Sequence, residues 1–586
     1  MNRTRAASTV AAAAALAMGI TACGSNSTTP KATGGSDNAP TYNAGVGKVF
    51  NASSAKGGTL RMANNADWDS LDPADTYYAY SWNFIRLYGR SLVMFKPAPG
   101  AGGTELVPDL ATSLGKPSDN AKTWTYTLRK GLKFEDGSPI TSKDVKYAVE
   151  RSLDKTVFPD GPTYMADFLD LKGYTSPYKD ASPDKLGLKA VDTPDDTTIV
   201  FHLKKPFSGF DYFAMQPGTI PVPRLKDTGA KYKQHVVSSG PYKFATNNAG
   251  KNFSLVRNEQ WDPTTDPNRK ALPDKIEVAL NVNADDIDNR LIAGDLDVGV
   301  EGSGVQPAAQ GRILADPTLK KQADSAAVAR LWYTSINPNV APLDNIHCRK
   351  AVEYASDKLA YQNAYGGPPG GDIATGLLPP LIPGAEKFDL YPAGADNKGD
   401  VTKAKDELTQ CGQPSGFATN FAYRAERPKE KATAEGLQQS LAKVGIKVTL
   451  KPFPQKDYFA LYAGKPSYAK NNKLGLLTNG WGADWPDGFG FLQQIVDSRV
   501  TRATGGSSNI SVAIPEVDKL LDAALLETDT AKRNKLWAGI DRRVMQDAVI
   551  LPGVWARGLV FRPKTLSNVF ISDGFQEYDY LSMGVK

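Results

Sequence analysis

The sequence has few of the residues on which metal and redox chemistry depend. Its 586 residues include three histidines, His202, His235 and His347, and three cysteines, without a close cluster of zinc-ligand spacing. The motifs H-E-x-x-H, G-x-S-x-G, G-x-x-x-x-G-K-[ST] and K-T-G are also absent. We therefore expect no cofactor and no metal site, and none of the enzyme classes that these motifs mark.

An excess of charge of either sign is missing as well. The net charge is +6, which falls to +4 once an N-terminal segment carrying Arg3, Arg5 and no acid is removed. This charge is small for so long a chain, and no recognition motif for nucleic acid occurs. Binding to DNA or RNA is therefore not expected.

No apolar run is long enough to cross a bilayer, which takes about 20 residues. The longest, Val10 to Ile20, follows two arginines and precedes small residues, the pattern of a cleaved signal peptide over 1–22. Ile20-Thr21-Ala22-Cys23 resembles the bacterial lipobox, which predicts acylation of Cys23. The alternative is an ordinary secretory signal beside a chance cysteine.

Large apolar side chains are scarce between Gly24 and Gly47, where Gly, Ser, Thr, Asn, Ala and Pro dominate. Such a composition cannot bury enough apolar surface to fold. We expect residues 23–54 to form a flexible tether.

The body beyond residue 54 shows alternating strand and helix signals. Trp124 to Leu128 alternates as a half-buried strand, and Thr141 with Asp144 predicts a helix start. Strand, helix and strand follow one another over 418–424, 430–444 and 446–450, which is a βαβ unit with a parallel sheet. A further strand over 474–479 leads into the loop Gly480-Trp481-Gly482-Ala483-Asp484. In open α/β sheets, ligands bind beyond such strand ends.

Cys348 and Cys411 are the two thiols left once Cys23 is acylated. An exported protein can hold them as a disulfide. Two free buried thiols are the alternative.

These segments together resemble the family 5 extracellular solute-binding proteins of ABC importers, from about Gly57 to the C-terminus. The stretch Trp124 to Val145, with Phe134-Glu135-Asp136-Gly137 as its turn, matches the family signature. Supporting pieces are Ser239-Gly240-Pro241-Tyr242, Pro342-Leu343-Asp344-Asn345, Arg349-Lys350-Ala351 and the Trp481 loop.

The resemblance implies an α/β fold of two lobes, of the class II periplasmic-binding-protein type, with an extra domain in the first lobe. Lobe I would combine 55–84, 206–330 and 551–586, the additional domain would span 85–205, and lobe II would span 331–550. The implied function is capture of di- or oligopeptides between the lobes by a monomer that makes and breaks no bond. The lipoprotein would sit on the outer face of the cytoplasmic membrane and deliver its ligand to the permease and ATPases of an importer.

By the same resemblance, Asp484 matches the aspartate that pairs with a peptide's α-ammonium. Gly480, Gly482 and Ala483 would leave backbone groups open to a peptide main chain. Asp484 as a plain turn carboxylate and Trp481 as a core residue remain alternatives. Further aromatic residues that could face the cleft, each with a core alternative, are Tyr80, Trp82, Tyr333 and Trp555.

Two other functions stay open. An oligosaccharide or a metal chelate could replace the peptide in the same role, because aromatic side chains also stack on sugar rings. An anchored serine hydrolase or penicillin-binding enzyme is the other class, since Ser152-x-x-Lys155, Ser440-x-x-Lys443 and Ser118-Asp119-Asn120 match short motifs of such enzymes.

Overall fold

The computed structural model describes residues 41–527 and 529–585. The expectations for the signal peptide, for Cys23 and for the first part of the tether lie outside these residues. None of the described helices is both long and apolar enough to pass through a bilayer.

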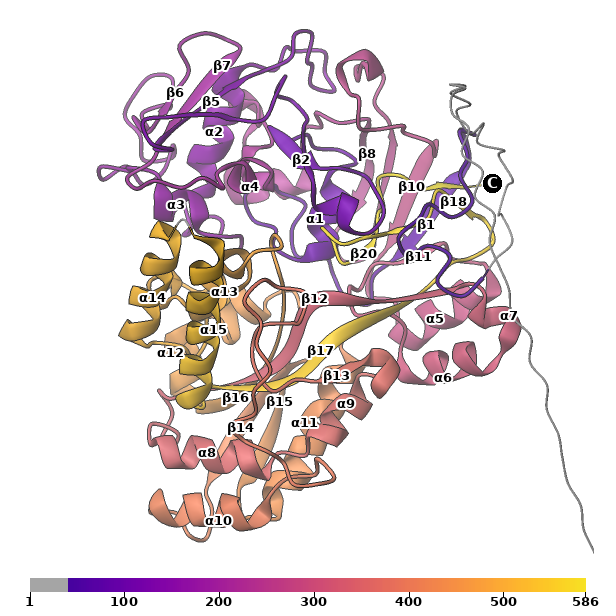
Figure 1. Cartoon of the computed structure of the whole chain (residues 1–586). Coiled ribbons are helices and arrows are strands. Elements are labelled where there is room, and N and C mark those ends of the chain that lie inside the picture. The colour runs from indigo at the N-terminus through magenta and orange to yellow at the C-terminus, as the bar shows by residue number, and fades with distance from the viewer. Residues whose placement is uncertain (1–40, 528, 586) are drawn as a thin grey trace, which may run out of the picture. The chain divides into compact units, whose positions relative to one another are not determined.

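Two mixed sheets form the framework (Figure 1). We call the part built on the five-stranded sheet lobe I and the part built on the six-stranded sheet lobe II. In spatial order, the first sheet contains β11 (Val298–Gly299), β1 (Thr59–Ala63), β10 (Lys275–Ala279), β9 (Asn252–Arg257) and β8 (Tyr242–Asn248). The second contains β13 (Gly371–Ile373), β17 (Ile550–Phe561), β12 (Ala323–Ile336), β16 (Leu474–Gly482), β14 (Ala418–Arg424) and β15 (Lys447–Phe453).

Local sequence signals place several elements as expected. β14, α11 (Pro428–Ala442) and β15 form the predicted βαβ unit, with β14 and β15 parallel. The helix predicted after Thr141 is α2 (Ser142–Ser152), which begins with a capping box between Thr141 and Asp144. A helix that packs its aromatic side into the core is predicted by the aromatic run of Tyr77, Tyr78, Tyr80, Trp82 and Phe84. The last three residues of this run lie in α1 (Ala79–Ile85), whose side chains are largely buried.

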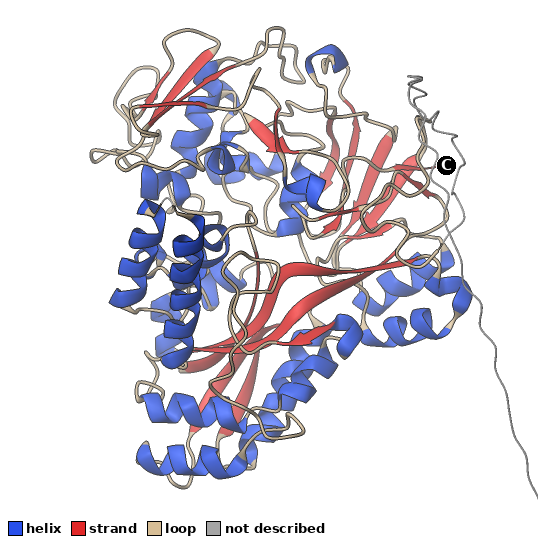
Figure 2. Cartoon of the chain, viewed as in Figure 1, coloured by secondary structure: helices blue, strands red, loops and turns tan. Residues whose placement is uncertain are grey.

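A four-stranded sheet of β4 (Lys116–Ser118), β5 (Thr123–Thr127), β7 (Thr198–His202) and β6 (Val191–Asp192) lies within the predicted additional domain. Its aromatic core continues into lobe II. Tyr164 on α3 (Tyr164–Phe168) packs against Trp485, with ring centroids 5.0 Å apart, and Tyr212 stacks on the same indole at 5.2 Å. The helices that surround both sheets are visible in Figure 2, among them α13 (Gly488–Val496), α14 (Pro515–Leu526) and α15 (Thr530–Gln546).

The long antiparallel strands β12 and β17 connect the lobes. Ala323 and Phe561, at one end of the pair, pack with lobe I residues such as Ile287. Trp332 and Val554, farther along, belong to the core of lobe II. The pairing register shifts between Ala327 and Leu331, so an irregularity separates the two halves.

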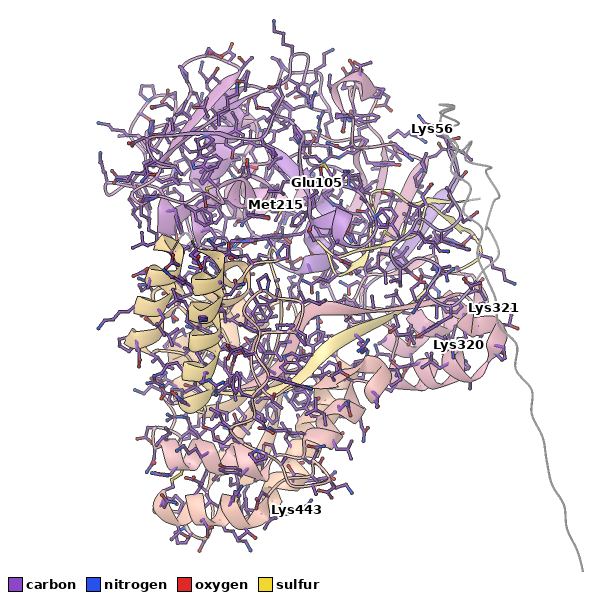
Figure 3. All side chains as sticks on the ribbon, viewed as in Figure 1. Lys56, Glu105, Met215, Lys320, Lys321 and Lys443 are labelled. Carbon is purple, nitrogen blue, oxygen red and sulfur yellow. A yellow bond between two sulfur atoms is a disulfide. The ribbon has the colours of Figure 1, made fainter. Side chains whose placement is uncertain are left out.

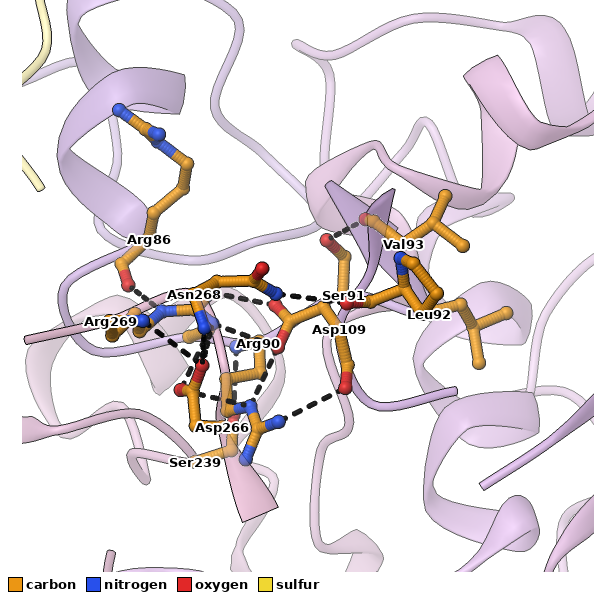
Figure 4. Close-up of polar contacts among 12 residues, drawn as sticks. Arg86, Arg90, Ser91, Leu92, Val93, Asp109, Ser239, Asp266, Asn268 and Arg269 are labelled. Carbon is orange, nitrogen blue, oxygen red and sulfur yellow. Dashed lines mark hydrogen bonds and ion pairs between the residues drawn. The ribbon is translucent and has the colours of Figure 1, made fainter. Parts of the chain in front are cut away.

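A buried ion-pair cluster joins three segments of lobe I and the additional domain (Figure 4). Asp109 accepts from Arg90 at 2.8 Å and from Arg269 at 2.7 Å, and Arg269 also pairs with Asp266 at 3.1 Å. All four side chains are almost completely buried. Each charge is therefore matched, which a buried ion requires.

The prediction that the flexible tether extends to residue 54 is wrong. Residues 41–54 lie against the body: Gly45 N donates to Asp324 Oδ1 at 2.9 Å, Phe50 forms a bridge with Val569, and Ser53 N donates to Asn568 Oδ1 at 3.0 Å. Composition misled the prediction because these contacts use backbone groups, which every residue possesses.

Candidate functional site

A cavity lies between the lobes, where about 1130 Å³ of space, part of it open to solvent, is free of protein atoms. Lobe I contributes α1 and the segment before it, together with 574–576, and lobe II contributes β16, the loop after it, and Arg424 and Arg427 beside the start of α11. The predicted residues Gly480, Trp481, Gly482, Ala483 and Asp484 all line this cavity.

Asp484 is the carboxylate around which this end of the cavity is arranged. Its Oδ2 accepts hydrogen bonds from the hydroxyls of Tyr77 at 2.8 Å and Tyr164 at 2.7 Å. No hydrogen bond from the described residues reaches Oδ1. Burial raises the pKa of Asp484 to about 7, although the two hydroxyls lower it. The site therefore holds an oriented carboxylate that a cation would help to ionise.

Gly480 and Gly482, which were expected in a loop, belong to the end of β16 and serve a different purpose from the one expected. A Cβ on Gly480 would meet the Trp332 ring at 2.1 Å, and one on Gly482 would lie 2.9 Å from Gln576. Ala483 N donates to Ala329 O at 2.9 Å, while its carbonyl accepts from Gln576 at 3.2 Å. The small residues make room for neighbouring side chains, and the expectation that Ala483 offers free backbone groups is wrong.

The aromatic candidates divide into two pairs. Tyr80 and Trp82 line the cavity, as does Trp481, which packs edge-on against Tyr77 with centroids 5.6 Å apart. Tyr333 is buried in the core, and Trp555 is half-buried on β17 and does not line the cavity. Trp481 is 8% exposed and also belongs to the core. It is therefore consistent with a ligand-binding role and with a core role.

Several residues in or next to the cavity carried no signal in the sequence. Tyr164 is 320 positions from the aspartate it contacts, and Arg330, Trp332 and Glu301 come from strands or loops without a recognisable motif. Tyr77 stood in the aromatic run but was assigned to the core. Only a family alignment could have indicated these positions, since their contacts are set by tertiary packing.

The cavity also contains buried cationic groups. Arg330 Nη1 donates to Gly302 O, its Nε has no partner among the described residues, and burial lowers its pKa to about 10. Arg424 is paired with Glu430, and Arg427 Nε donates to Gln455 Oε1 at 2.6 Å. The cavity thus contains the carboxylate of Asp484 and, at other positions, guanidinium groups. This combination suits a ligand that carries a positive and a negative charge at separate ends.

The short motifs of serine enzymes lie on separate elements. Ser152 ends α2, Ser440 is on α11 and Ser118 is on β4. Ser152 Oγ donates to Val149 O at 2.7 Å and Lys155 Nζ to Asp160 O at 2.8 Å, so both groups serve local structure.

A two-lobed α/β protein with a cavity between its lobes has the architecture of a solute receptor. The model of the bacterial extracellular solute-binding proteins, family 5, matches residues 105–502, and the chain belongs to that family. It is a binding protein and not an enzyme, and its fold is of the class II periplasmic-binding-protein type.

Individual relatives span nearly the whole chain. The solved structure of clavulanic acid biosynthesis oligopeptide binding protein 2 is 43% identical, with a TM-score of 0.83, covering 94% of this chain and 99% of that one. The probable D,D-dipeptide-binding periplasmic protein DdpA of Escherichia coli is 27% identical over 83% of this chain and 87% of its own length. The Helicobacter pylori protein DppA, solved with the peptide STSA, has a TM-score of 0.74 at 21% identity over 91% and 99%, and shares the fold.

The predicted disulfide and two predicted domain boundaries can also be compared with the structure. Cys348 on α8 (Ile346–Ala355) and Cys411 after α10 (Val401–Gln410) form a disulfide with Cα atoms 5.3 Å apart, which decides between the two alternatives. The boundary predicted at 330/331 falls inside β12, and that at 550/551 falls at the first residues of β17.

Proposed function

We propose that this protein captures peptides in the interlobe cavity and delivers them to a membrane ABC importer. The supporting observation is Asp484, whose Oδ2 is fixed by two tyrosine hydroxyls while Oδ1 has no hydrogen bond from the described residues. A peptide α-ammonium placed at Oδ1 would gain a charge-assisted hydrogen bond and supply the missing positive charge. The names of several relatives, which refer to peptides, point to the same ligand class.

The experiment is calorimetric titration with Ala-Ala-Ala and with its N-acetylated form, which lacks the α-ammonium. We expect the free peptide to bind and acetylation to weaken binding at least tenfold. Asp484→Asn should abolish the difference, whereas Asp372→Asn, an exposed pair with Arg557, should preserve it. Equal affinity for both peptides in the unmodified protein would refute the role of Asp484.

An oligosaccharide is the second ligand class, because the cavity lining includes the rings of Trp332, Trp481, Phe459 and Phe575. A metal chelate is a third. Competition experiments with Ala-Ala-Ala, a cello-oligosaccharide and a nickel chelate distinguish the three ligand classes. The compound of the correct class should displace the other two.

We also propose that Cys23 is acylated, that the mature protein is a monomer, and that it is held at the outer face of the cytoplasmic membrane. The lipobox-like sequence before Cys23 supports the anchor. Mass spectrometry of the mature N-terminal peptide tests it, and an unmodified cysteine would reject the anchor without affecting peptide capture.

A further inference from the structure

A second cavity, with about 690 Å³ of space that is partly open to solvent, adjoins the main one. Glu301, Gly302, Arg330, Trp332 and Gln576 line both, so the two spaces meet at these residues. We call the second space the side pocket. Its far wall comes from lobe I, including α5 (Ala284–Ala293) and residues 298–305.

The junction contains acceptor atoms without partners. Glu301 is 4% exposed, and its Oε2 has no hydrogen bond within the described chain. The buried Oε1 of Gln576 is likewise unpaired there, although its amide nitrogen donates to Ala483 O. An unpaired buried acceptor costs free energy, which a ligand donor would recover.

Two further carboxyl groups border the side pocket. Asp288 Oδ2 accepts from Gln306 N at 2.6 Å, and Glu577 accepts from Asn83 at 3.1 Å and from Tyr580 at 2.8 Å. Burial raises the pKa of Glu301 and of Glu577 to about 7, and that of Asp288 to about 8. The pocket thus holds three carboxyls whose ionisation is opposed by burial, and which a bound cation would favour in the ionised form.

The surrounding cations do not fully match these carboxyls. Arg330 is balanced chiefly by Glu577, and Lys429 faces Glu301 and Asp288 together. Lys429 Nζ itself donates to the carbonyls of Ser303 at 2.7 Å and Val305 at 2.8 Å. Arg424 pairs with Glu430, Arg427 lies near both Glu430 and Glu301, and Arg557, which also lines the pocket, pairs with the exposed Asp372. Glu301, Asp288 and Glu577 therefore lie near cations, but none of the three forms a direct ion pair among the described residues.

Much of the remaining wall is apolar. The apolar part includes Ile287, Leu291, Val298, Val328 and Val560. Such walls suit a methylene chain, whereas the carboxyls suit only its charged end.

We propose that the side pocket is a subsite for a cationic ligand side chain with an aliphatic stem, such as that of lysine, whose head group binds Glu301. This subsite rests on the proposed function, because it extends a peptide already held at Asp484. It makes the receptor prefer peptides with one basic residue over peptides of the same size without one.

The test uses three tripeptides, Lys-Ala-Ala, Ala-Lys-Ala and Ala-Ala-Lys, each compared by calorimetry with its norleucine counterpart. Norleucine keeps the stem and removes the ammonium. We expect one lysine position to bind about tenfold more tightly than its counterpart, the change that about 1.4 kcal/mol produces. Equal or weaker affinity for lysine at all three positions would overturn the proposal, while retained binding of the norleucine peptides would leave peptide capture intact.

The matched variants are Glu301→Gln and Glu277→Gln. Glu301→Gln should remove the lysine preference and keep the affinity for the norleucine peptide, because the shape of the side chain is preserved. Glu277 lies on β10 with its side chain 49% exposed and paired with Lys275, so its substitution should leave the preference unchanged. A lysine preference that survives Glu301→Gln would place the cation elsewhere. If Glu301→Gln fails to fold, equal affinity of the unmodified protein for the lysine and norleucine peptides would still overturn the proposal.

Discussion

Asp484 shows how one side chain couples ligand chemistry to pH. Its pKa is raised to about 7 by burial, so the carboxyl is largely neutral below pH 7 in the ligand-free protein. A bound ammonium favours the ionised form. The affinity for a simple peptide should therefore fall as the pH decreases below 7.

For Ala-Ala-Ala, which has no basic side chain, we expect about a tenfold loss of affinity per pH unit below the pKa, until the pKa of the complex is reached. Calorimetry between pH 5 and 8 measures this dependence. Asp484→Asn should give a weak, flat profile, and a flat profile in the unmodified protein would contradict the expectation.

Asp109 illustrates a buried charge that stabilises the fold. Asp109→Asn would leave Arg90 and Arg269 without their shared carboxylate, and breaking such a buried pair costs about 3–5 kcal/mol. Glu105→Gln is the control, because Glu105, marked in Figure 3, forms an exposed pair with Lys96 whose loss costs about 0–1 kcal/mol. Urea unfolding of both variants measures the difference, and equal midpoints would refute it.

At the scale of single elements, the disulfide fastens α8 to the end of α10. It closes a loop with a sequence separation of 63, worth roughly 4 kcal/mol in the chain-entropy model. Cys348→Ser with Cys411→Ser should lower the free energy of unfolding by about that amount. The reduced unmodified protein serves as the second measurement, and a change below about 1 kcal/mol in both would contradict the model.

The elements that sequence could predict are those specified by nearby residues. The capping box at Thr141 and the βαβ unit around α11 depend on contacts within a few residues, and the structure contains both. The segment 41–54 and Tyr164 could not be assigned, because their partners lie hundreds of positions away. For the site, the loop after β16 was predicted, whereas the groups that orient Asp484 were not.

For the molecule as a whole, β12 and β17 offer a place to bend. The register shift between Ala327 and Leu331 lies between a part of the strand pair packed in lobe I and a part packed in lobe II, so bending there keeps each end of the pair in its own lobe. We infer that closure pivots at this irregularity. Contacts such as Lys429 Nζ to Ser303 O, at 2.7 Å, then stabilise the closed arrangement.

Lys429→Met should increase the open population and therefore the radius of gyration without ligand. Small-angle scattering measures it, with and without a saturating peptide. Lys431→Met, which removes an exposed pair with Glu435 from the same helix, should behave as the unmodified protein. Matching scattering curves for Lys429→Met and the unmodified protein would show that this contact does not hold the lobes together.

The grip of Tyr77 and Tyr164 on Asp484 joins segments 407 and 320 residues apart in the chain. The same carboxylate would also bind the solute. A substitution of Asp484 that changes ligand specificity would therefore also remove the hydrogen bonds between these segments. Variants of this protein with a substitution at Asp484 should consequently have a higher ligand dissociation rate, even where the new ligand fits the cavity well.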